Sequence, residues 1–167
     1  MTGSADLDDT DKRILAALQE DGRLTNVELA ERVGLSPSPC LRRVRILEDA
    51  GIIRGYQAVV DQAAVGLPVS VFVSVKLEKQ REDALQRFEK AVRAFPEVLE
   101  CYLMTGSRDY LLRVVAKDLA DYERFLKATL TRIDGVASIE SSFALAQVKH
   151  AAVLPLRSPP ATRARSR

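Results

Sequence analysis

Residues 25–55, TNVELAERVGLSPSPCLRRVRILEDAGIIRG, decide the fold of the first part of the chain. Thr25 and Glu28 stand three residues apart, a spacing at which each side chain can accept the other residue's backbone N–H where a helix begins. Gly34 permits the left-handed turn that ends this helix, and Ser36 with the proline after it starts the next one. Two short helices joined in this way predict a helix-turn-helix.

The second helix of the pair has two faces of different character. Its inward face is apolar and consists of Cys40, Val44 and Leu47. Its outward face is mostly charged and consists of Arg42, Arg45, Ile46 and Asp49. Ser38 and Pro39 project from the first turn, where base edges would lie in a DNA groove. The pattern favours DNA binding, although arginines also cluster on helix faces that only meet solvent.

A third helix and a wing are expected on either side of this pair. Upstream, Asp8 can form a capping box with Asp11 at the start of a helix. The apolar stripe of that helix consists of Leu7, Ile14, Leu15 and Leu18. Downstream, residues 52–56 lead into an alternating run, which predicts a short strand pair. Residues 1–60 are therefore expected to form a winged helix-turn-helix domain.

Residues 61–150 carry a different pattern, in which strand and helix periods follow one another. The expected elements are a strand at 69–77, a helix at 85–95, strands at 98–105 and 110–115, a helix at 119–133 and a strand at 139–145. This βαββαβ order predicts a ferredoxin-like sandwich, so the whole chain belongs to the α+β class.

A sheet covered by helices on one face leaves its other face partly apolar. Candidates for that open face are Phe72, Val98, Tyr102 and Met104. Because soluble monomers rarely expose such a patch, a homodimer is expected. Two reading helices held at a fixed separation would bind double-stranded DNA at near-palindromic sites.

Composition is that of a cytoplasmic protein of one or two domains, with 167 residues, 47% hydrophobic and 29% charged. No apolar run approaches the roughly 18 residues of a membrane span, and no signal sequence begins the chain, so no membrane partner is expected. Cys40 and Cys101 fall on apolar faces and are expected to be buried, reduced thiols. A single histidine, His150, predicts no metal site.

Charge is distributed unevenly along the chain, although the net charge is only +2. Residues 1–60 carry 8 lysines and arginines against 10 acids, whereas residues 149–167 carry 5 against none. The basic, proline-containing end, residues 151–167, is expected to be a disordered tail. It would either attract DNA phosphates nonspecifically or remain a solvated tail without function.

The sequence also bears on two other classes of function, an enzyme and an architectural protein. An enzyme would need a convergent acid, base or nucleophile, a metal spacing or a phosphate loop, and none of these patterns occurs. The chain is therefore not expected to be an enzyme or to need a cofactor. A nucleoid-architectural DNA-binding protein without a small-molecule effector stays open as the alternative.

Several segments together resemble the Lrp/AsnC family of feast/famine transcriptional regulators. They are LDDTDKRIL at 7–15, DGR at 21–23, NVELAERVGLSPSPCLRRVRILE at 26–48, GYQAVVD at 55–61 and ECYLMTGSRDYLLRV at 100–114. The resemblance covers about residues 7–150. It implies an N-terminal winged helix-turn-helix and a C-terminal effector-binding and oligomerisation domain. It also implies homodimers that assemble into tetramers or octamers under the control of a free amino acid.

For DNA contact, the resemblance implies the first turns of the second helix of the pair: Ser36, Ser38, Pro39, Arg42, Arg43 and Arg45. Arg43 lies at the edge of the core face, so an ion pair with a neighbouring acid competes with DNA contact there. Relatives often carry a basic residue in place of Ile46, so the resemblance implies that this chain makes one phosphate contact fewer.

For effector binding, the resemblance implies the hairpin tip and the last strand: Leu103, Gly106, Ser107, Arg108, Asp109, Tyr110, Ser142, Phe143 and Ala144. Gly106 also suits an ordinary turn, and Leu103 or Phe143 could belong to the core. Arg108 could bind a ligand carboxylate, or pair with Asp109 or an acid of a neighbouring subunit. Leucine-responsive relatives tend to carry an aromatic residue in place of Arg108 and a tyrosine in place of Ser142, so the effector's identity stays open.

Overall fold

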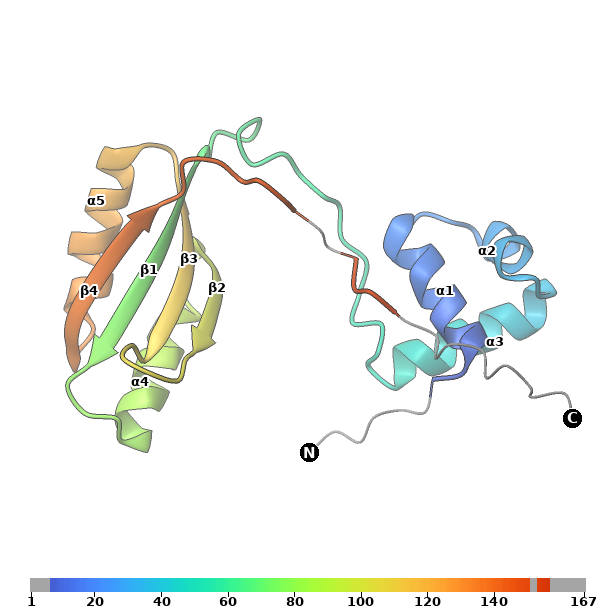
Figure 1. Ribbon diagram of the computed structural model, residues 1–167, viewed down its shortest axis with the longest axis horizontal. Coiled ribbons are helices and arrows are strands. Elements are labelled where there is room, and N and C mark those ends of the chain that lie inside the picture. The colour runs from blue at the N-terminus through green and yellow to red at the C-terminus, as the bar shows by residue number, and fades with distance from the viewer. Residues whose placement is uncertain (1–6, 151–152, 157–167) are drawn as a thin grey trace, which may run out of the picture. The chain divides into compact units, whose positions relative to one another are not determined.

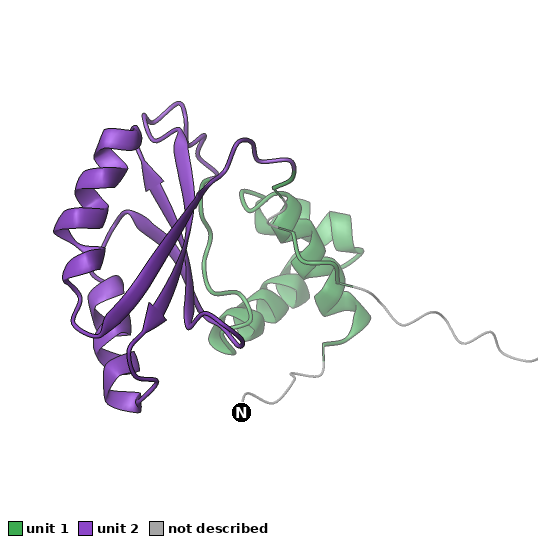
Figure 2. Cartoon of the chain, turned by 60° about the vertical axis from the view of Figure 1, so that its left-hand side comes forward, with its two compact units in different colours: residues 1–58, 149–167 green, residues 59–148 purple. Residues whose placement is uncertain are grey.

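The computed structural model describes residues 7–150 and 153–156 of the chain (Figure 1). The chain divides into two compact units (Figure 2). The first holds the described residues up to Ala58 together with those from Lys149 onwards, and the second is Val59–Val148.

Three helices make up the first unit: α1 (Asp9–Glu20), α2 (Asn26–Val33) and α3 (Pro37–Asp49). Both expected capping boxes are present, Asp8 with Asp11 and Thr25 with Glu28, so two helix starts are fixed by local hydrogen bonds. Gly34 ends α2 in the left-handed region, at a φ of 71°. The buried core between the helices consists of Ile14, Leu15, Ala17, Leu29, Ala30, Val33, Cys40 and Leu47.

The start of α3 is held differently from what the sequence predicts. Ser36 occupies the N-cap position, but its hydroxyl makes no capping hydrogen bond among the described residues. Instead, Nδ2 of Asn26 donates to the carbonyl oxygen of Pro37 at 2.8 Å. This bond joins the first residue of α2 to the first residue of α3 and so helps to set how the two helices meet.

The predicted strand pair of the wing is wrong, because residues 51–60, all of them described, contain no strand. A strand needs a neighbouring backbone to pair with, and exposed residues 54–60 run without one among the described residues. Tyr56 is nevertheless held, because its hydroxyl donates to Oε1 of Glu48 at 3.0 Å. Its ring also lies against Gly22, where a Cβ would come within 3.4 Å.

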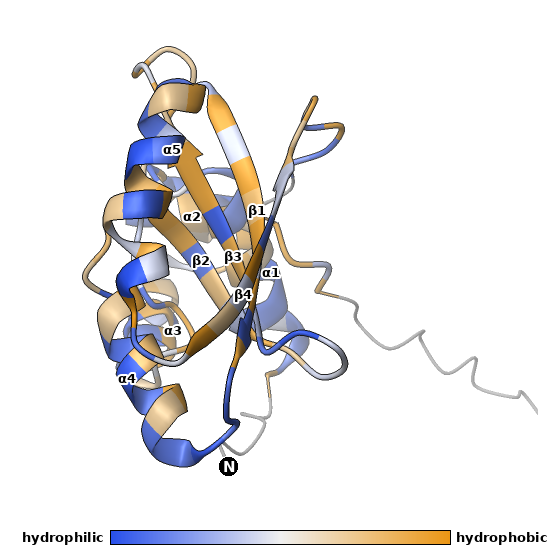
Figure 3. Ribbon diagram, turned by 90° about the vertical axis from the view of Figure 1, so that its left-hand side faces the viewer, coloured by the Kyte–Doolittle hydropathy of each residue, from blue (hydrophilic) through white to orange (hydrophobic). Residues whose placement is uncertain are grey.

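The second unit has the expected βαββαβ order and α+β class. Its elements are β1 (Val69–Leu77), α4 (Glu82–Val92), β2 (Val98–Leu103), β3 (Tyr110–Ala116), α5 (Leu119–Ala128), a 3₁₀ turn (Leu130–Arg132) and β4 (Val136–Phe143). The strands form an antiparallel sheet in the order β2-β3-β1-β4. Both helices lie along the same face of the sheet (Figure 3), so the opposite face is left uncovered by this unit.

Helix α5 ends at Ala128, earlier than the apolar pattern predicts. The backbone of Thr129 leaves the helical region, and a 3₁₀ turn replaces the predicted helix end at Ile133. The hydroxyl of Thr131 donates to the carbonyl oxygens of Leu126 and Lys127, both at 3.1 Å, which satisfies groups that a longer helix would have bonded.

Two apolar positions lie in places that the sequence pattern did not predict. Leu145 is fully exposed and lies beyond β4, which starts at Val136 instead of Ile139. Cys101 is exposed because it sits on β2, an outer strand of the sheet, whereas Cys40 is fully buried as expected. Periodicity identifies the face of an element, but coverage at a sheet edge depends on tertiary packing.

One carboxylate ties the β2–β3 hairpin to β1 from inside the second unit. The side chain of Asp109 is buried, and its Oδ2 accepts from the backbone N–H of Leu77 at 2.7 Å. Its Oδ1 accepts from Nε2 of Gln80 at 2.6 Å. The backbone N–H of Asp109 also donates to the carbonyl of Val75 at 3.0 Å. Both carboxylate oxygens are thus used within the fold.

The chain returns to the first unit after the last strand. Residues 151–152 and 157–167 of the predicted disordered tail lie outside the described residues. Residues 153–156 are described, and Leu156 packs against the core of the helix-turn-helix. The backbone of Leu154 forms hydrogen bonds with the side chain of Gln19 in α1. The backbone of Leu154 and the side chain of Leu156 therefore have partners in the first unit.

Replacement of Asp109 by alanine should lower the free energy of unfolding of the second unit by about 2 kcal/mol or more. The change leaves the buried N–H of Leu77 without an acceptor. Asp109→Asn should cost less than about 1 kcal/mol, because an amide oxygen can still accept from Leu77 while Gln80 turns its amide. Urea unfolding of the full chain measures both values, and equal losses in the two variants would contradict this role.

Candidate nucleic-acid interface and ligand site

The exposed side of α3 carries a straight line of polar side chains. Ser38, Arg42, Arg45 and Asp49 follow one another at spacings of four, three and four residues, and all four are exposed. Ser36 and Pro39 are exposed beside them at the start of the helix. Five of the six predicted DNA-contact residues therefore lie together on one accessible surface.

Arg42 and Arg45 keep their guanidinium groups available. Neither forms an ion pair within the part of the chain that the structure describes. Ile46 lies beside them and is 55% exposed, so the surface also offers an apolar contact. An unpaired guanidinium can donate to phosphate oxygens or, in a bidentate manner, to a guanine edge.

Arg43 differs from the other two arginines because it is held by acids of α1. Its Nη1 lies 2.7 Å from Oδ2 of Asp8 and 2.7 Å from Oδ1 of Asp11. The backbone N–H of Asp11, and next the Arg43 side chain, lower the pKa of Asp8. Of the two expected alternatives for Arg43, the structure therefore contains the ion pair.

The tip of the β2–β3 hairpin is accessible in part. Gly106 has a φ of 110°, which favours glycine, and Ser107 beside it is exposed. Leu103, at the end of β2, is 61% exposed and so is not a core residue. Arg108 forms an ion pair with Glu140 of β4, a different partner from the two that the sequence suggested.

Two predicted ligand residues of the hairpin point into the protein. The buried carboxylate of Asp109 accepts from the N–H of Leu77 and from Gln80. Tyr110 is buried, and its hydroxyl donates to Oε1 of Glu89 at 3.1 Å. Burial, and next that hydrogen bond, raise the pKa of Tyr110. Both residues therefore support the hairpin from within and do not line its accessible surface.

The end of β4 divides its residues between the two faces of the sheet. Ser142 pairs with Phe72 on the open face, whereas Phe143 packs edge-to-face on Tyr122, with ring centroids 5.3 Å apart, on the helix side. Ala144 extends the ladder, because its N–H donates to the carbonyl of Ser70 at 3.0 Å.

The two predicted halves of the ligand site lie at opposite ends of β1. Tyr110, beside the hairpin tip, pairs with Val75, whereas Phe143 pairs with Val71. At a rise of about 3.3 Å per residue, these positions are separated by roughly 13 Å along the strand. One chain therefore does not bring the hairpin tip and Ser142–Ala144 together.

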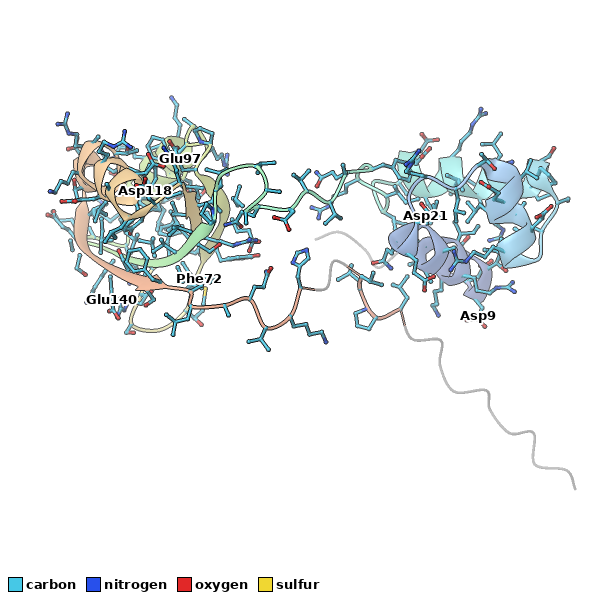
Figure 4. The ribbon with its side chains drawn as sticks, turned by 90° about the horizontal axis from the view of Figure 1, so that it is seen from above. Asp9, Asp21, Phe72, Glu97, Asp118 and Glu140 are labelled. Carbon is cyan, nitrogen blue, oxygen red and sulfur yellow. The ribbon has the colours of Figure 1, made fainter. Side chains whose placement is uncertain are left out.

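A polar network on the open face was not predicted from the sequence. Arg113 of β3 donates to Oε1 of Glu100 and to Oε1 of Gln62, both at 3.2 Å. The hydroxyl of Tyr102 donates to the same Glu100 carboxylate at 2.8 Å. Phe72 and Glu140 lie on this face too (Figure 4). Alternation along the strands indicates which residues share a face, but it does not show the two partners of Arg113, which are 13 and 51 positions away.

The described residues contain neither a metal-binding cluster nor a membrane-spanning helix. No group of three or more histidine, cysteine or acidic residues there could hold a metal ion. No helix there has the length and apolar content needed to cross a membrane.

Known proteins match both units of the chain. Residues 7–54 match a winged helix-turn-helix DNA-binding domain, and residues 70–154 match the Lrp/AsnC ligand binding domain. The Bkd operon transcriptional regulator of Pseudomonas aeruginosa is 53% identical, over 91% of this chain and 99% of that protein. The leucine-responsive regulatory protein of Rhizobium meliloti is 43% identical, over 90% of this chain and 97% of that protein.

Solved structures agree with these matches. A transcriptional regulator of Neisseria meningitidis in complex with L-Met superposes with a TM-score of 0.85 and 49% identity, over 90% of this chain and 97% of that one. A feast or famine regulatory protein of M. tuberculosis complexed with L-methionine superposes with a TM-score of 0.77 and 34% identity, over 89% of this chain and 98% of that one. Both domain matches, in the same order as the two units, show that this chain belongs to the Lrp/AsnC family of DNA-binding transcriptional regulators.

Proposed function

We propose that this regulator reads duplex DNA with α3 and changes its DNA binding or its assembly when a free amino acid binds to the second unit. DNA binding by α3 is supported by the exposed line of Ser38, Arg42 and Arg45. The guanidinium groups of the two arginines lack an ion-pair partner among the described residues. Because its target is DNA, we place the protein in the cytoplasm, and the proposed mechanism needs no cofactor.

In this proposal different residues of α3 contact phosphates, contact bases and position the helix. Arg42 and Arg45 bind phosphates or base edges, and Ser38 in the first turn reads a base. Ser36 and Pro39 lie against the backbone beside it. Arg43 positions the helix through Asp8 and Asp11 and is not itself a direct contact.

Arg42→Ala and Arg45→Ala should each lower the magnitude of the log–log salt slope of DNA binding by about 0.9, because each removes one phosphate contact. Their melting temperatures should equal that of the unmodified protein. Arg43→Ala should instead lower the melting temperature, since it leaves two acids of α1 without their cation. Gel-shift titrations over a salt series and thermal unfolding separate the two roles. An unchanged slope for Arg42→Ala would exclude a phosphate contact, and an unchanged affinity as well would remove that residue from the interface.

Ser38→Ala should alter the preference at one base position by about 1 kcal/mol, because a hydroxyl contact to a base edge is lost. Competition between duplexes that differ at single positions measures this change. Equal weakening on all sequences would make Ser38 a backbone contact.

For assembly, we propose a homodimer formed through the open face of the sheet. Phe72 is 41% exposed and Tyr102 is 52% exposed on that face, beside the Arg113–Glu100 pair. An apolar centre with a polar network beside it is the composition of a protein–protein interface. Dimers would then associate further into tetramers or octamers and would hold two copies of α3 against a near-palindromic site.

Phe72→Glu should reduce the assembled protein toward monomers at micromolar concentration, because a carboxylate would be buried at the centre of the interface. The matched control is Leu119→Glu, which places the same charge on an exposed apolar position of α5 and should leave the size unchanged. Light scattering measures both variants. A monomeric unmodified protein, or equal effects of the two substitutions, would contradict assembly through this face.

For the effector, we propose a site between subunits, with the hairpin tip of one chain and the end of β4 of another. This follows from the separation of the two sets along β1, and two solved relatives hold L-methionine. Leu103, Gly106, Ser107, Arg108, Ser142, Phe143 and Ala144 supply the accessible groups in this proposal. Asp109 and Tyr110 support the hairpin from inside. A ligand carboxylate would compete with Glu140 for Arg108.

An amino acid that binds should raise the melting temperature of the protein in a screen of the twenty amino acids. Arg108→Gln should weaken this response, whereas Glu140→Gln should strengthen it, because it frees the guanidinium for the ligand. Asp109→Asn should retain the response, since the buried carboxylate is already occupied within the fold. Equal responses of the Arg108 and Glu140 variants would mean that the pair is only structural. No response to any amino acid would contradict the effector proposal.

A further inference from the structure

Helix α3 begins without a capping hydrogen bond of its own. A serine at the N-cap position usually accepts from the N–H of the second or third helical residue. The third helical residue here is Pro39, which has no N–H, and the first, Pro37, has none either. The hydroxyl of Ser36 makes no capping bond among the described residues. The first turn of α3 therefore depends on a contact from elsewhere in the fold.

That contact comes from Asn26, the first residue of α2. Its Nδ2 donates to the carbonyl oxygen of Pro37 at 2.8 Å. Six residues after Pro37, Arg43 is held by Asp8 and Asp11 of α1. At a rise of about 1.5 Å per residue, the two anchored positions are roughly 9 Å apart along the helix axis. The helix is thus anchored at two points, first to α2 and then to α1.

The side chains proposed to contact DNA lie differently with respect to these two anchors. Ser38 follows Pro37 directly, so the bond from Asn26 lies one residue from the proposed base contact. Arg45 comes after Arg43 and hence lies beyond the second anchor. Loss of the first anchor should therefore displace Ser38 more than Arg45.

The side chain of Asn26 adds little to the stability of the fold. Its Oδ1 is buried and has no hydrogen-bond partner within the part of the chain that the structure describes. An unpaired buried acceptor costs free energy, which offsets the gain from the bond to Pro37. The carbonyl of Pro37 also belongs to the α-helical ladder, so it retains a partner without Asn26. The start of α2 rests on the capping box of Thr25 and Glu28.

We propose that Asn26 is a positioning residue for sequence reading, which holds the first turn of α3 so that Ser38 meets its base edge. Asn26 makes no contact with DNA in this proposal and acts only through Pro37. The proposal rests on DNA reading by α3 and adds the residue that determines its specificity at one base position. Such a residue should affect base preference without lowering the melting temperature.

The test measures binding of the full chain to its preferred duplex and to duplexes that differ from it at single positions. Asn26→Ala should reduce discrimination at the position read by Ser38 about fivefold, as much as Ser38→Ala does. The log–log salt slope should not change, because no charged group is removed. Asn26→Leu, which has nearly the same shape but no donor, should give the same result. Its agreement with the alanine variant excludes an effect of the lost volume.

A double-mutant cycle separates a positioning role from a structural one. The effects of Asn26→Ala and Ser38→Ala on that base position should not add, because the second change removes a contact that the first has already lost. The effects of Asn26→Ala and Arg45→Ala on affinity should add, since Arg45 lies beyond the second anchor. The matched control is Gln19→Ala, which breaks a side-chain amide bond to the backbone of Leu154 in the same unit. It should leave base preference unchanged.

Three results would overturn the proposal. They are unchanged discrimination in both Asn26 variants, fully additive effects of Asn26→Ala and Ser38→Ala, and a melting temperature that falls together with the affinity for every duplex. If Ser38→Ala itself alters no base preference, base reading by Ser38 fails and this inference fails with it. A base effect of Ser38→Ala alongside an unaffected Asn26→Ala leaves reading by α3 intact and rejects only the inference.

Discussion

The position of α3 depends on the contact of Arg43 with Asp8 and Asp11, because this ion pair joins α3 to the start of α1. Both acids also form the capping box of α1 with their other carboxylate oxygens, so the same two side chains begin one helix and position another. The pKa of Asp8 is lowered, and its contribution to stability is therefore present at neutral pH and is lost as the pH falls through that lowered value. With Arg43 held by these acids, Arg42 and Arg45 are the arginines of α3 that form no ion pair within the described part of the chain.

The second unit is a sheet that one layer of helices covers on one face only. Val71, Val73 and Val75 of β1 are fully buried beneath α4 and α5, while Phe72 between them is exposed. Alternation along one strand thus supplies both the core and the surface proposed for assembly. The proposed ligand groups of the hairpin tip lie near one end of β1, and those of β4 lie near the other end. If their site is completed by a second chain, ligand binding and assembly are linked reciprocally.

The sequence predicted those features that depend on neighbours in the chain. Both capping boxes, the left-handed Gly34 and the buried face of α3 follow from spacings of three to seven residues. Features that depend on distant partners were missed or left open. The acids that hold Arg43, the pairing of Arg108 with Glu140 and the burial of Asp109 all involve residues about thirty positions apart. The prediction of a strand pair at the wing was wrong for the same reason, because a strand requires a pairing partner that the local sequence pattern does not show.

The central claim, that this chain is a sequence-specific regulator whose DNA binding responds to an amino acid, is tested most directly by selecting binding sites from a random pool of duplex DNA. The selection is run with the unmodified protein, with and without the amino acids that raise its melting temperature. A near-palindromic motif should be enriched, and its recovery or half-site spacing should change when the amino acid is present. Binding that enriches no motif in either condition would contradict this claim and would support a sequence-tolerant architectural protein.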